Sequence, residues 1–270
     1  MAETISIIMG IYNCATTLPE AIDSILQQTY SDWKLILCDD GSTDETFAVA
    51  ESYRIRFPEK ILLLKNEKNM GLNYTLNRCF DKAHGEYIAR MDGDDISLPE
   101  RFEKELAAFA AEPDLSVISS SMIYFDEIGE YCSAVPLCEY PKKEMLVRGT
   151  VHCHAPCMIK SDVLRSVGGY SISKKLLRVE DWHLWLKIYA AGGRGKNLNE
   201  ALYKMRDDRN AANRRKFRYR LNEAYVASLA VKELGLPKLK YIYVLRPIIV
   251  GLLPGFLYRY LHKQKMKALS

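Results

Sequence analysis

Residues 85–95 have the sequence GEYIARMDGDD. Residues 87–91 are predicted to form a buried strand, and Asp92, Asp94 and Asp95 follow it directly. Carboxylates at alternate positions of an extended chain point to one side, where like charges repel unless a cation joins them. Mg²⁺ and Mn²⁺ prefer oxygen ligands and commonly bridge carboxylates to substrate phosphates. The motif therefore predicts a divalent-metal site, with a solvated acidic turn as the alternative.

The chain before this motif alternates between predicted strands (4–9, 33–38, 61–65, 87–91) and predicted helices (17–26, 42–53, 71–84, 97–111). Gly85 is expected to end the third helix. Capping boxes are expected to begin the other three, at Thr17/Glu20, Ser42/Glu45 and Ser97/Glu100. The pattern predicts an α/β fold with an open, mostly parallel sheet and helices on both faces. Because ligands bind beyond the carboxyl ends of such strands, residues 9–12, 39–40 and 92–95 should converge.

The second half is less regular. Residues 115–135 are strand-like, 152–160 and 199–205 are predicted strands, and 161–167 and 180–191 are predicted helices. A long helix over 211–234, basic at its start, should end at Gly235 and Pro237. That break is the best candidate in the chain for a boundary between structural units.

Composition indicates an ordinary globular protein, since 48% of the 270 residues are hydrophobic and 27% are charged. The N-terminus lacks the pattern of a signal peptide, and seven cysteines without a regular framework suit reduced thiols, so a cytoplasmic location is expected. Charge is divided unevenly. Residues 1–203 carry 22 basic and 30 acidic side chains, whereas residues 204–270 carry 16 basic and four acidic ones.

Residues 236–270 contain seven Lys and Arg residues and no acidic residue. Their longest uncharged stretch, 247–258, is about a dozen residues, against about 20 for a transmembrane helix, and Pro247, Gly251, Pro254 and Gly255 should interrupt it. Aromatic and basic residues together predict association with an anionic membrane surface. The alternatives are packing against the rest of the chain or a homodimer contact, and the apolar runs argue against nucleic acid.

Five motifs match one family in order and spacing. They are ISIIMGIYN (5–13), SILQQTY (24–30), DDGSTD (39–44), NMGL (69–72) and residues 85–95. With these motifs the chain closely resembles the inverting family 2 glycosyltransferases, which have the GT-A fold. The resemblance implies transfer of a sugar from a nucleotide donor to a saccharide or lipid-linked saccharide, in bacterial cell-surface polysaccharide synthesis. It also implies a nucleotide-sugar-binding half (1–110), an acceptor-binding half (111–210) and a helical, basic, membrane-associating extension (211–270).

On the donor side, the resemblance assigns roles by position. Tyr12 matches an aromatic residue that packs on the nucleotide base, and Asp40 an acid that accepts a hydrogen bond from it. Asp92 matches the acid near the ribose, Asp94 the direct ligand of Mn²⁺ or Mg²⁺, with Asp92 beside it at the metal, and Asp95 an additional acid. A Tyr and an Asp favour uridine diphosphate. The alternatives are a core position for Tyr12 and helix capping by Asp40.

On the acceptor side, Asp181 matches the catalytic base of the family. Inversion by single displacement needs one carboxylate to take the proton of the acceptor hydroxyl, although an acid here also suits a helix N-terminus. Glu180, Trp182 and His154 are expected to lie near the acceptor. Arg206 stands near the place where many relatives have a His, so we expect it to contact the diphosphate, and the third metal ligand stays open.

The segment 152–157, HCHAPC, has ligand types for zinc, but its spacing is too tight for a structural zinc site. A sugar-nucleotidyltransferase is a rival enzyme class, and it should have a Gly-rich, basic phosphate loop after the first strand, which residues 10–14 do not provide. A catalytically inactive nucleotide-sugar-binding protein is the other rival, and the intact acidic residues argue against it. The Gly-x-Gly-x-x-Gly fingerprint of a dehydrogenase is absent.

Overall fold

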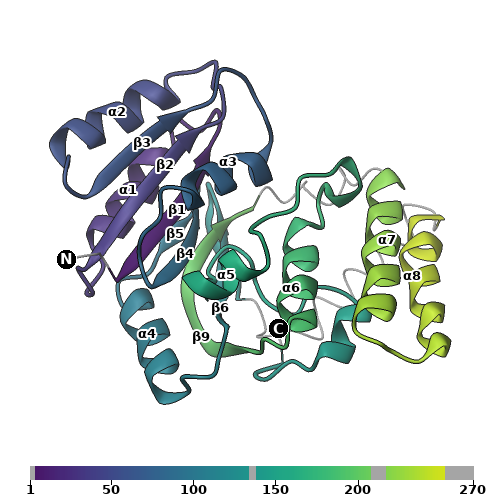
Figure 1. The fold of residues 1–270 in the computed structure, drawn as a ribbon. Coiled ribbons are helices and arrows are strands. Elements are labelled where there is room, and N and C mark those ends of the chain that lie inside the picture. Colours follow the sequence, from purple (N-terminus) through teal and green to yellow (C-terminus); the bar gives the residue numbers. More distant parts are fainter. Residues whose placement is uncertain (1–3, 134–137, 208–216, 253–270) are drawn as a thin grey trace.

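The structure, a computed structural model, describes residues 4–133, 138–207 and 217–252 (Figure 1). Its first half contains four parallel strands in the order β3-β2-β1-β4. Helices connect these strands, as the sequence predicts. The elements are β1 (Ile5–Ile11), α1 (Leu18–Leu26), β2 (Trp33–Asp39), α2 (Thr46–Arg56), β3 (Ile61–Lys65), α3 (Leu72–Phe80), β4 (Tyr87–Asp92) and α4 (Arg101–Ala111).

The second half extends the same sheet, which has nine strands within the described residues. Strand β8 (Met158–Lys160) pairs antiparallel with β4 and with β6 (Val117–Asp126), and β9 (Gly195–Arg206) runs parallel to β6. Strands β5 (Ile96–Ser97) and β7 (Gly129–Ser133) pair antiparallel with β9 and β6. The remaining elements are η1 (Lys143–Val147), α5 (Ser161–Ser166), η2 (Lys174–Leu176), α6 (Glu180–Ala190), α7 (Phe217–Glu233), η4 (Lys238–Tyr241) and α8 (Ile242–Leu252).

Apolar residues fill both faces of this sheet. Successive side chains of a strand point to opposite faces, so Ile7 and Met9 of β1 join one core cluster and Ile8 joins the other. The first cluster includes side chains of α1, α2 and α4, and the second includes those of α3, α6 and α7. Helices therefore cover both faces, which confirms the predicted α/β class.

Several predicted local details are wrong because tertiary contacts replace them. No cap of α1, α2 or α4 is a side-chain capping box. Thr17 instead donates its hydroxyl to the carbonyls of Cys14 and Gly93, Ser42 accepts from the Asn13 amide, and Ser97 lies in β5. Helix α3 ends at Phe80, before Gly85.

The segment 152–157 is not part of a strand, since β8 begins at Met158. The His152 ring is fully buried and hydrogen-bonds to Asn197 Oδ1 at 2.7 Å and to the Tyr189 hydroxyl at 3.0 Å. This histidine is therefore a satisfied core residue.

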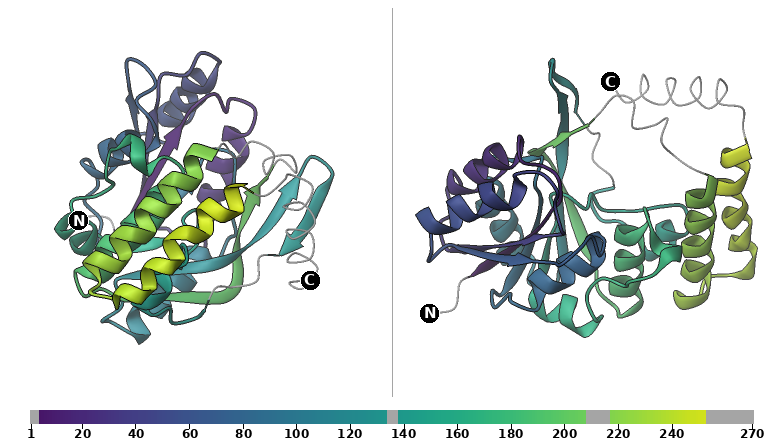
Figure 2. Two further views of the ribbon diagram at one scale, coloured as in Figure 1. Left: turned by 90° about the vertical axis from the view of Figure 1, so that its right-hand side faces the viewer. Right: turned by 90° about the horizontal axis from the view of Figure 1, so that it is seen from above.

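Helices α6, α7 and α8 lie side by side, with α8 farthest from the sheet (Figures 1 and 2). Gly235, at a φ of +63°, follows the end of α7, as expected for the break there. The predicted interruption at Pro247 and Gly251 is wrong within the described residues, since α8 continues through both. A Cβ on Gly251 would lie 2.9 Å from Phe217, so this glycine lets α8 approach α7 closely. No helix in the described ranges has both the length and the apolar character needed to cross a membrane.

Candidate active site

The polar residues that follow β1, β2 and β4 meet at one edge of the sheet. Gly10 of β1 is in register with Asp92 of β4, and Ile11 is in register with Asp39 of β2. The Asp40 amide donates to the Ile11 carbonyl at 2.8 Å, which ties the ends of β1 and β2 together. The predicted convergence of three distant segments is confirmed.

The acidic motif at the end of β4 forms a compact cluster. One carboxylate oxygen from each of Asp92, Asp94 and Asp95 lies within 4.8 Å of the others. Asp94 is exposed, Asp92 is half-buried and Asp95 is buried. Gly93 allows the turn between them to pack closely, since a Cβ there would lie 3.0 Å from Cys14 Sγ. The cluster therefore offers carboxylate oxygens at the edge of the sheet, and those of Asp94 are the most accessible.

The electrostatics of this cluster suit a divalent cation. Although Asp94 as a whole residue is exposed, the surrounding protein partly desolvates its carboxyl group, and this effect, followed by the charge of Asp92, raises the pKa of Asp94. Burial, and then the charges of both neighbours, raises the pKa of Asp95 well above its usual range. Asp95 Oδ1 accepts the Arg206 amide at 2.8 Å, whereas its buried Oδ2 has no hydrogen-bond partner among the described residues. Three repelling carboxylates, one with an unpartnered buried oxygen, are a donor set that fits Mg²⁺ or Mn²⁺.

Two arginines flank the cluster. Arg90 lies two positions before Asp92 on the same strand, is almost fully buried, and pairs its Nη2 with Asp92 Oδ1 at 2.5 Å. Arg206, at the end of β9, donates Nε to the Asp94 carbonyl at 3.0 Å and pairs with Glu20 at 2.6 Å. Arg206 thus lies beside the motif with its guanidinium bonded to protein partners, and its contact with the diphosphate stays a prediction.

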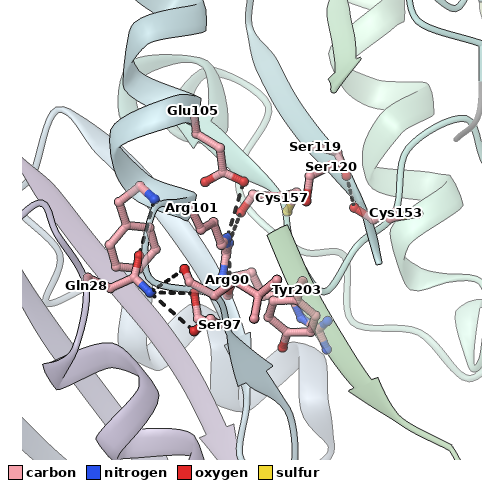
Figure 3. Close-up of polar contacts among 12 residues, drawn as sticks. Gln28, Arg90, Ser97, Arg101, Glu105, Ser119, Ser120, Cys153, Cys157 and Tyr203 are labelled. Atoms are coloured by element: carbon pink, nitrogen blue, oxygen red, sulfur yellow. Dashed lines mark hydrogen bonds and ion pairs between the residues drawn. The ribbon is translucent and has the colours of Figure 1, made fainter. Parts of the chain in front are cut away.

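A buried polar layer supports β4 beneath the motif (Figure 3). Arg101 of α4 is fully buried, pairs with Glu105 at 3.2 Å and donates to the carbonyls of Arg90 and Cys157. Burial raises the pKa of Glu105 to about 7, against the lowering effect of Arg101. The Asp92 amide donates to the Tyr203 hydroxyl at 3.2 Å. These contacts hold the end of β4 at a defined position relative to α4 and β9.

Tyr12 and Asp40 lie at the ends of β1 and β2. Tyr12 is 46% exposed, so it is not a core aromatic residue and its ring is free to meet a ligand. Asp40 is buried and accepts hydrogen bonds from the Asn66 side chain and from the amides of Met70 and Gly71. It therefore fixes the loop before α3 and does not cap the helix after Ser42.

Asp181 lies in the first turn of α6 and is half-buried. Burial, and then the charge of Glu180, raises its pKa to about 6, while the Trp182 amide, the Thr150 hydroxyl and Arg90 act in the opposite direction. The charges of both Asp92 and Asp181 act on the Tyr170 hydroxyl, as does that of Arg90. Arg90 and Tyr170 thus lie within electrostatic range of both Asp92 in the acidic cluster and Asp181 on α6.

The other predicted acceptor-side residues occupy different environments. The His154 ring contacts the Tyr170 hydroxyl at 2.9 Å, and burial together with Arg90 lowers its pKa well below the usual value, so it is neutral. Glu180 is half-buried beside Asp181. The Trp182 ring is buried and donates its Nε1 to the Leu146 carbonyl at 2.7 Å, so it fixes the start of α6 and offers little surface to a ligand.

Sequence reasoning did not single out Arg90, Tyr170 or Tyr203. Only Arg90 carried a local signal, because residues i and i+2 of a strand share a face and a cation there would meet Asp92. The two tyrosines reach the site from β9 and from the loop after α5, contacts that no local pattern reveals.

Comparison with known proteins places this arrangement in a family. The profile described as "Glycosyl transferase family 2" matches residues 6–167. The chain is 40% identical to the putative glycosyltransferase EpsE of Bacillus subtilis (strain 168) over 262 residues, which cover 97% of this chain and 94% of that protein. It is 30% identical over 198 residues to WfaP of Escherichia coli, a UDP-Glc:alpha-D-GlcNAc-diphosphoundecaprenol beta-1,3-glucosyltransferase, with 73% and 74% coverage.

Solved structures have the same fold. The crystal structure of S. aureus TarS 1-349 in complex with UDP-GlcNAc superposes with a TM-score of 0.68 at 19% sequence identity, covering 92% of this chain and 70% of that one. This match confirms the GT-A fold that the motifs implied. The chain belongs to glycosyl transferase family 2.

Proposed function

We propose that this glycosyltransferase transfers a sugar from a nucleoside diphosphate donor, a UDP-sugar, with inversion and with the help of Mn²⁺ or Mg²⁺. The observation that carries the proposal is that two acidic centres lie within electrostatic range of the same buried groups, Arg90 and Tyr170. One is the three-carboxylate cluster after β4, and the other is Asp181 on α6.

Asp181 suits the role of catalytic base. A base works best when its pKa lies near the working pH, and burial raises that of Asp181 to about 6. At neutral pH it is mostly deprotonated, yet basic enough to take the proton of the acceptor hydroxyl as that oxygen attacks the anomeric carbon. Single displacement needs no covalent intermediate, so one such carboxylate suffices.

The donor end of the proposed site is formed by Asp94, Asp92, Tyr12 and Asp40. Asp94 and Asp92 would hold the metal, which when bound neutralises charge on the departing diphosphate. Tyr12, being half-exposed, is free to stack on the base. Asp40 already accepts three hydrogen bonds and retains about one acceptor site, on Oδ2, for the base. Arg206 would contact the diphosphate after exchanging its bond to Glu20, since Arg binds phosphate oxygens well.

The acceptor is proposed to be a saccharide or lipid-linked saccharide of a polysaccharide pathway. WfaP, by its name, glucosylates an N-acetylglucosamine linked to diphosphoundecaprenol. Glu180 precedes Asp181 in the chain, and the His154 ring contacts the Tyr170 hydroxyl, on which the charge of Asp181 acts. Both residues would contact this acceptor. Trp182 would act indirectly, by fixing the start of α6.

We further propose that the enzyme works at the inner face of the cell membrane through its C-terminal helices. Tyr243, Val244 and Pro247 pack inward, which agrees with the expected contact to the rest of the chain for one face of α8. The opposite face is apolar and exposed. It carries Ile242, Leu245, Ile249 and Leu252.

Basic residues accompany this exposed face. Lys238, Lys240 and Arg246 lie on η4 and α8, and no acidic residue occurs from 236 to 270. An apolar stripe with flanking cations is the pattern of a helix that lies in an anionic membrane interface. The remaining predicted contacts, at residues 253–270, lie outside the described residues.

The test is release of nucleoside diphosphate from a panel of UDP-, GDP- and dTDP-sugars, with Mn²⁺ and a set of saccharide acceptors. The proposal expects metal-dependent, acceptor-stimulated release of UDP, and Asp181→Asn should abolish the acceptor-stimulated part while UDP binding persists. Binding of UDP without release in any combination would favour the inactive binding protein. Inverted stereochemistry is checked by NMR of the glycosidic product.

A further inference from the structure

A cavity of about 360 Å³ lies between η1, the loop that follows it, and η4. That volume is within the range of about 300–1,000 Å³ that small-molecule sites occupy. Its basic lining comes from Lys142 and Arg148 at the two ends of η1 and from Lys240 of η4. Residues far apart in the chain thus bring three cations to one concave surface.

The cations of this cavity are not neutralised by the protein. Among the described residues, none of the three forms an ion pair with a carboxylate, and Glu144 is the one acidic residue in the lining. Lys142 and Arg148 are exposed and Lys240 is half-buried. The surplus of two positive charges in a concave site favours an anion that carries about two negative charges.

The cavity has a defined structure. Arg148 donates to the Tyr243 hydroxyl at 2.6 Å with its guanidinium 4.6 Å from that ring centroid, and its carbonyl accepts from Arg246 at 3.0 Å. These contacts tie the loop after η1 to α8. The cationic wall is therefore held by the same helix whose outer face is apolar.

Thr150 connects this cavity to the proposed base. Its side chain lines the cavity, and its hydroxyl lies close enough to the Asp181 carboxylate to lower the pKa of that group. A ligand with its anionic part in the cavity would thus place an attached hydroxyl-bearing group near Asp181. The charges of Asp181 and of Asp92 in the acidic cluster both act on the Tyr170 hydroxyl, so the two acidic groups lie within electrostatic range of the same side chain.

From this geometry we infer that the cavity binds the diphosphate of a lipid-linked acceptor, with the acceptor sugar directed toward Asp181 and the lipid toward α8. The inference rests on the proposed function, and it specifies the acceptor as a sugar joined to lipid through a diphosphate. A neutral saccharide would leave Lys142, Arg148 and Lys240 without an anionic partner. The planar fork of Arg148 and the two ammonium groups supply charge-assisted hydrogen bonds to phosphate oxygens.

The experiment measures binding of farnesyl diphosphate to the full chain by calorimetry, at low salt and in EDTA, so that a metal-dependent donor site does not contribute. The pocket variant is Lys142→Met. The control variant, Lys143→Met, removes the neighbouring exposed lysine, which lies outside the cavity. We expect the pocket variant to bind at least about tenfold more weakly, the effect of losing about 1.4 kcal/mol, and the control variant to bind as the wild type does.

Three further measurements distinguish a lipid diphosphate from free phosphate and from a membrane surface as the ligand of the cavity. Farnesol should not compete, inorganic phosphate should compete far more weakly than farnesyl diphosphate, and both variants should bind phosphatidylglycerol vesicles equally well. No binding by the wild type, or equal weakening in both variants, overturns the inference. Equally strong competition by inorganic phosphate, or a selective loss of vesicle binding in the pocket variant, also overturns it.

Binding of UDP with Mn²⁺ is measured on the same proteins and should be unchanged in the pocket variant. Failure of UDP to bind the wild type would count against the proposed function. Farnesyl diphosphate binding tests the cavity independently of that result.

Discussion

Replacing Glu180 by Gln tests whether its neighbour Asp181 is the catalytic base. Burial and the neighbouring charge of Glu180 raise the pKa of Asp181 from 3.8 to about 6. A base must be deprotonated to act, so activity should rise with pH through this value. With a pKa of about 6, about nine tenths of the enzyme is competent at pH 7 and about one tenth at pH 5, so kcat/KM should fall about tenfold between them.

The Glu180→Gln variant removes the second of the two causes and leaves burial, the larger one. The pKa of Asp181 should therefore fall, and the acidic limb of the kcat/KM profile should move to lower pH by up to about one unit. Below pH 6 the variant should then be relatively more active than the wild type, provided that Glu180 makes no essential acceptor contact. In Asp181→Asn the acidic limb of the kcat/KM profile should disappear, and the rate should fall by at least about 10²-fold.

The assay is nucleoside diphosphate release at saturating Mn²⁺ over pH 4.5–8.5, with protein integrity checked at each pH. Glu59→Gln, at an exposed acid before β3, is the matched control and should leave the limb in place. An acidic limb that is identical in the wild type and in Glu180→Gln would refute the assignment of that limb to Asp181. A similar limb in Asp181→Asn at near-normal rate would show that the base lies elsewhere.

Other predictions follow from particular contacts. Arg101→Met breaks a fully buried ion pair and should lower the free energy of unfolding by about 3–5 kcal/mol in urea titrations, and a loss below about 1 kcal/mol would show that Glu105 tolerates burial without its cationic partner. Leu245→Glu with Ile249→Glu should abolish co-sedimentation with anionic liposomes without changing UDP binding, whereas equal sedimentation would reject the membrane role of α8. Asp40→Asn should weaken both UDP binding and the loop before α3, costing about 1–3 kcal/mol of stability, since one amide group cannot accept the same three bonds. An unchanged free energy of unfolding in Asp40→Asn would contradict the role of Asp40 in fixing the loop before α3.

The sequence predicted the parts of this protein that depend on local pattern. The four parallel strands and the convergence of Tyr12, Asp40 and Asp92 follow from alternating strands and helices, because the carboxyl ends of parallel strands share an edge. The helix at Asp181 followed from its apolar face and acidic start. These features need no knowledge of distant partners.

Contacts between distant segments could not be predicted in this way. The capping boxes failed because the Thr17 and Ser42 side chains bond to other loops. The fully buried Arg101 resembles a surface residue in a helical pattern, and only the carbonyls that it meets on β4 explain its position. The basic cavity combines η1 with η4, about 100 residues later in the chain, so neither segment alone indicates it.

The most direct test of the central claim is calorimetric titration of UDP into the wild type, Asp94→Ala and Asp181→Asn, each with and without Mn²⁺. The cluster of Asp92, Asp94 and Asp95 is proposed to join metal to diphosphate, whereas Asp181 is proposed to act on the acceptor alone. Mn²⁺ should therefore strengthen UDP binding at least about tenfold in the wild type and in Asp181→Asn, and should have no effect in Asp94→Ala. Equal binding by the wild type with and without Mn²⁺, or an intact Mn²⁺ effect in Asp94→Ala, would contradict the account.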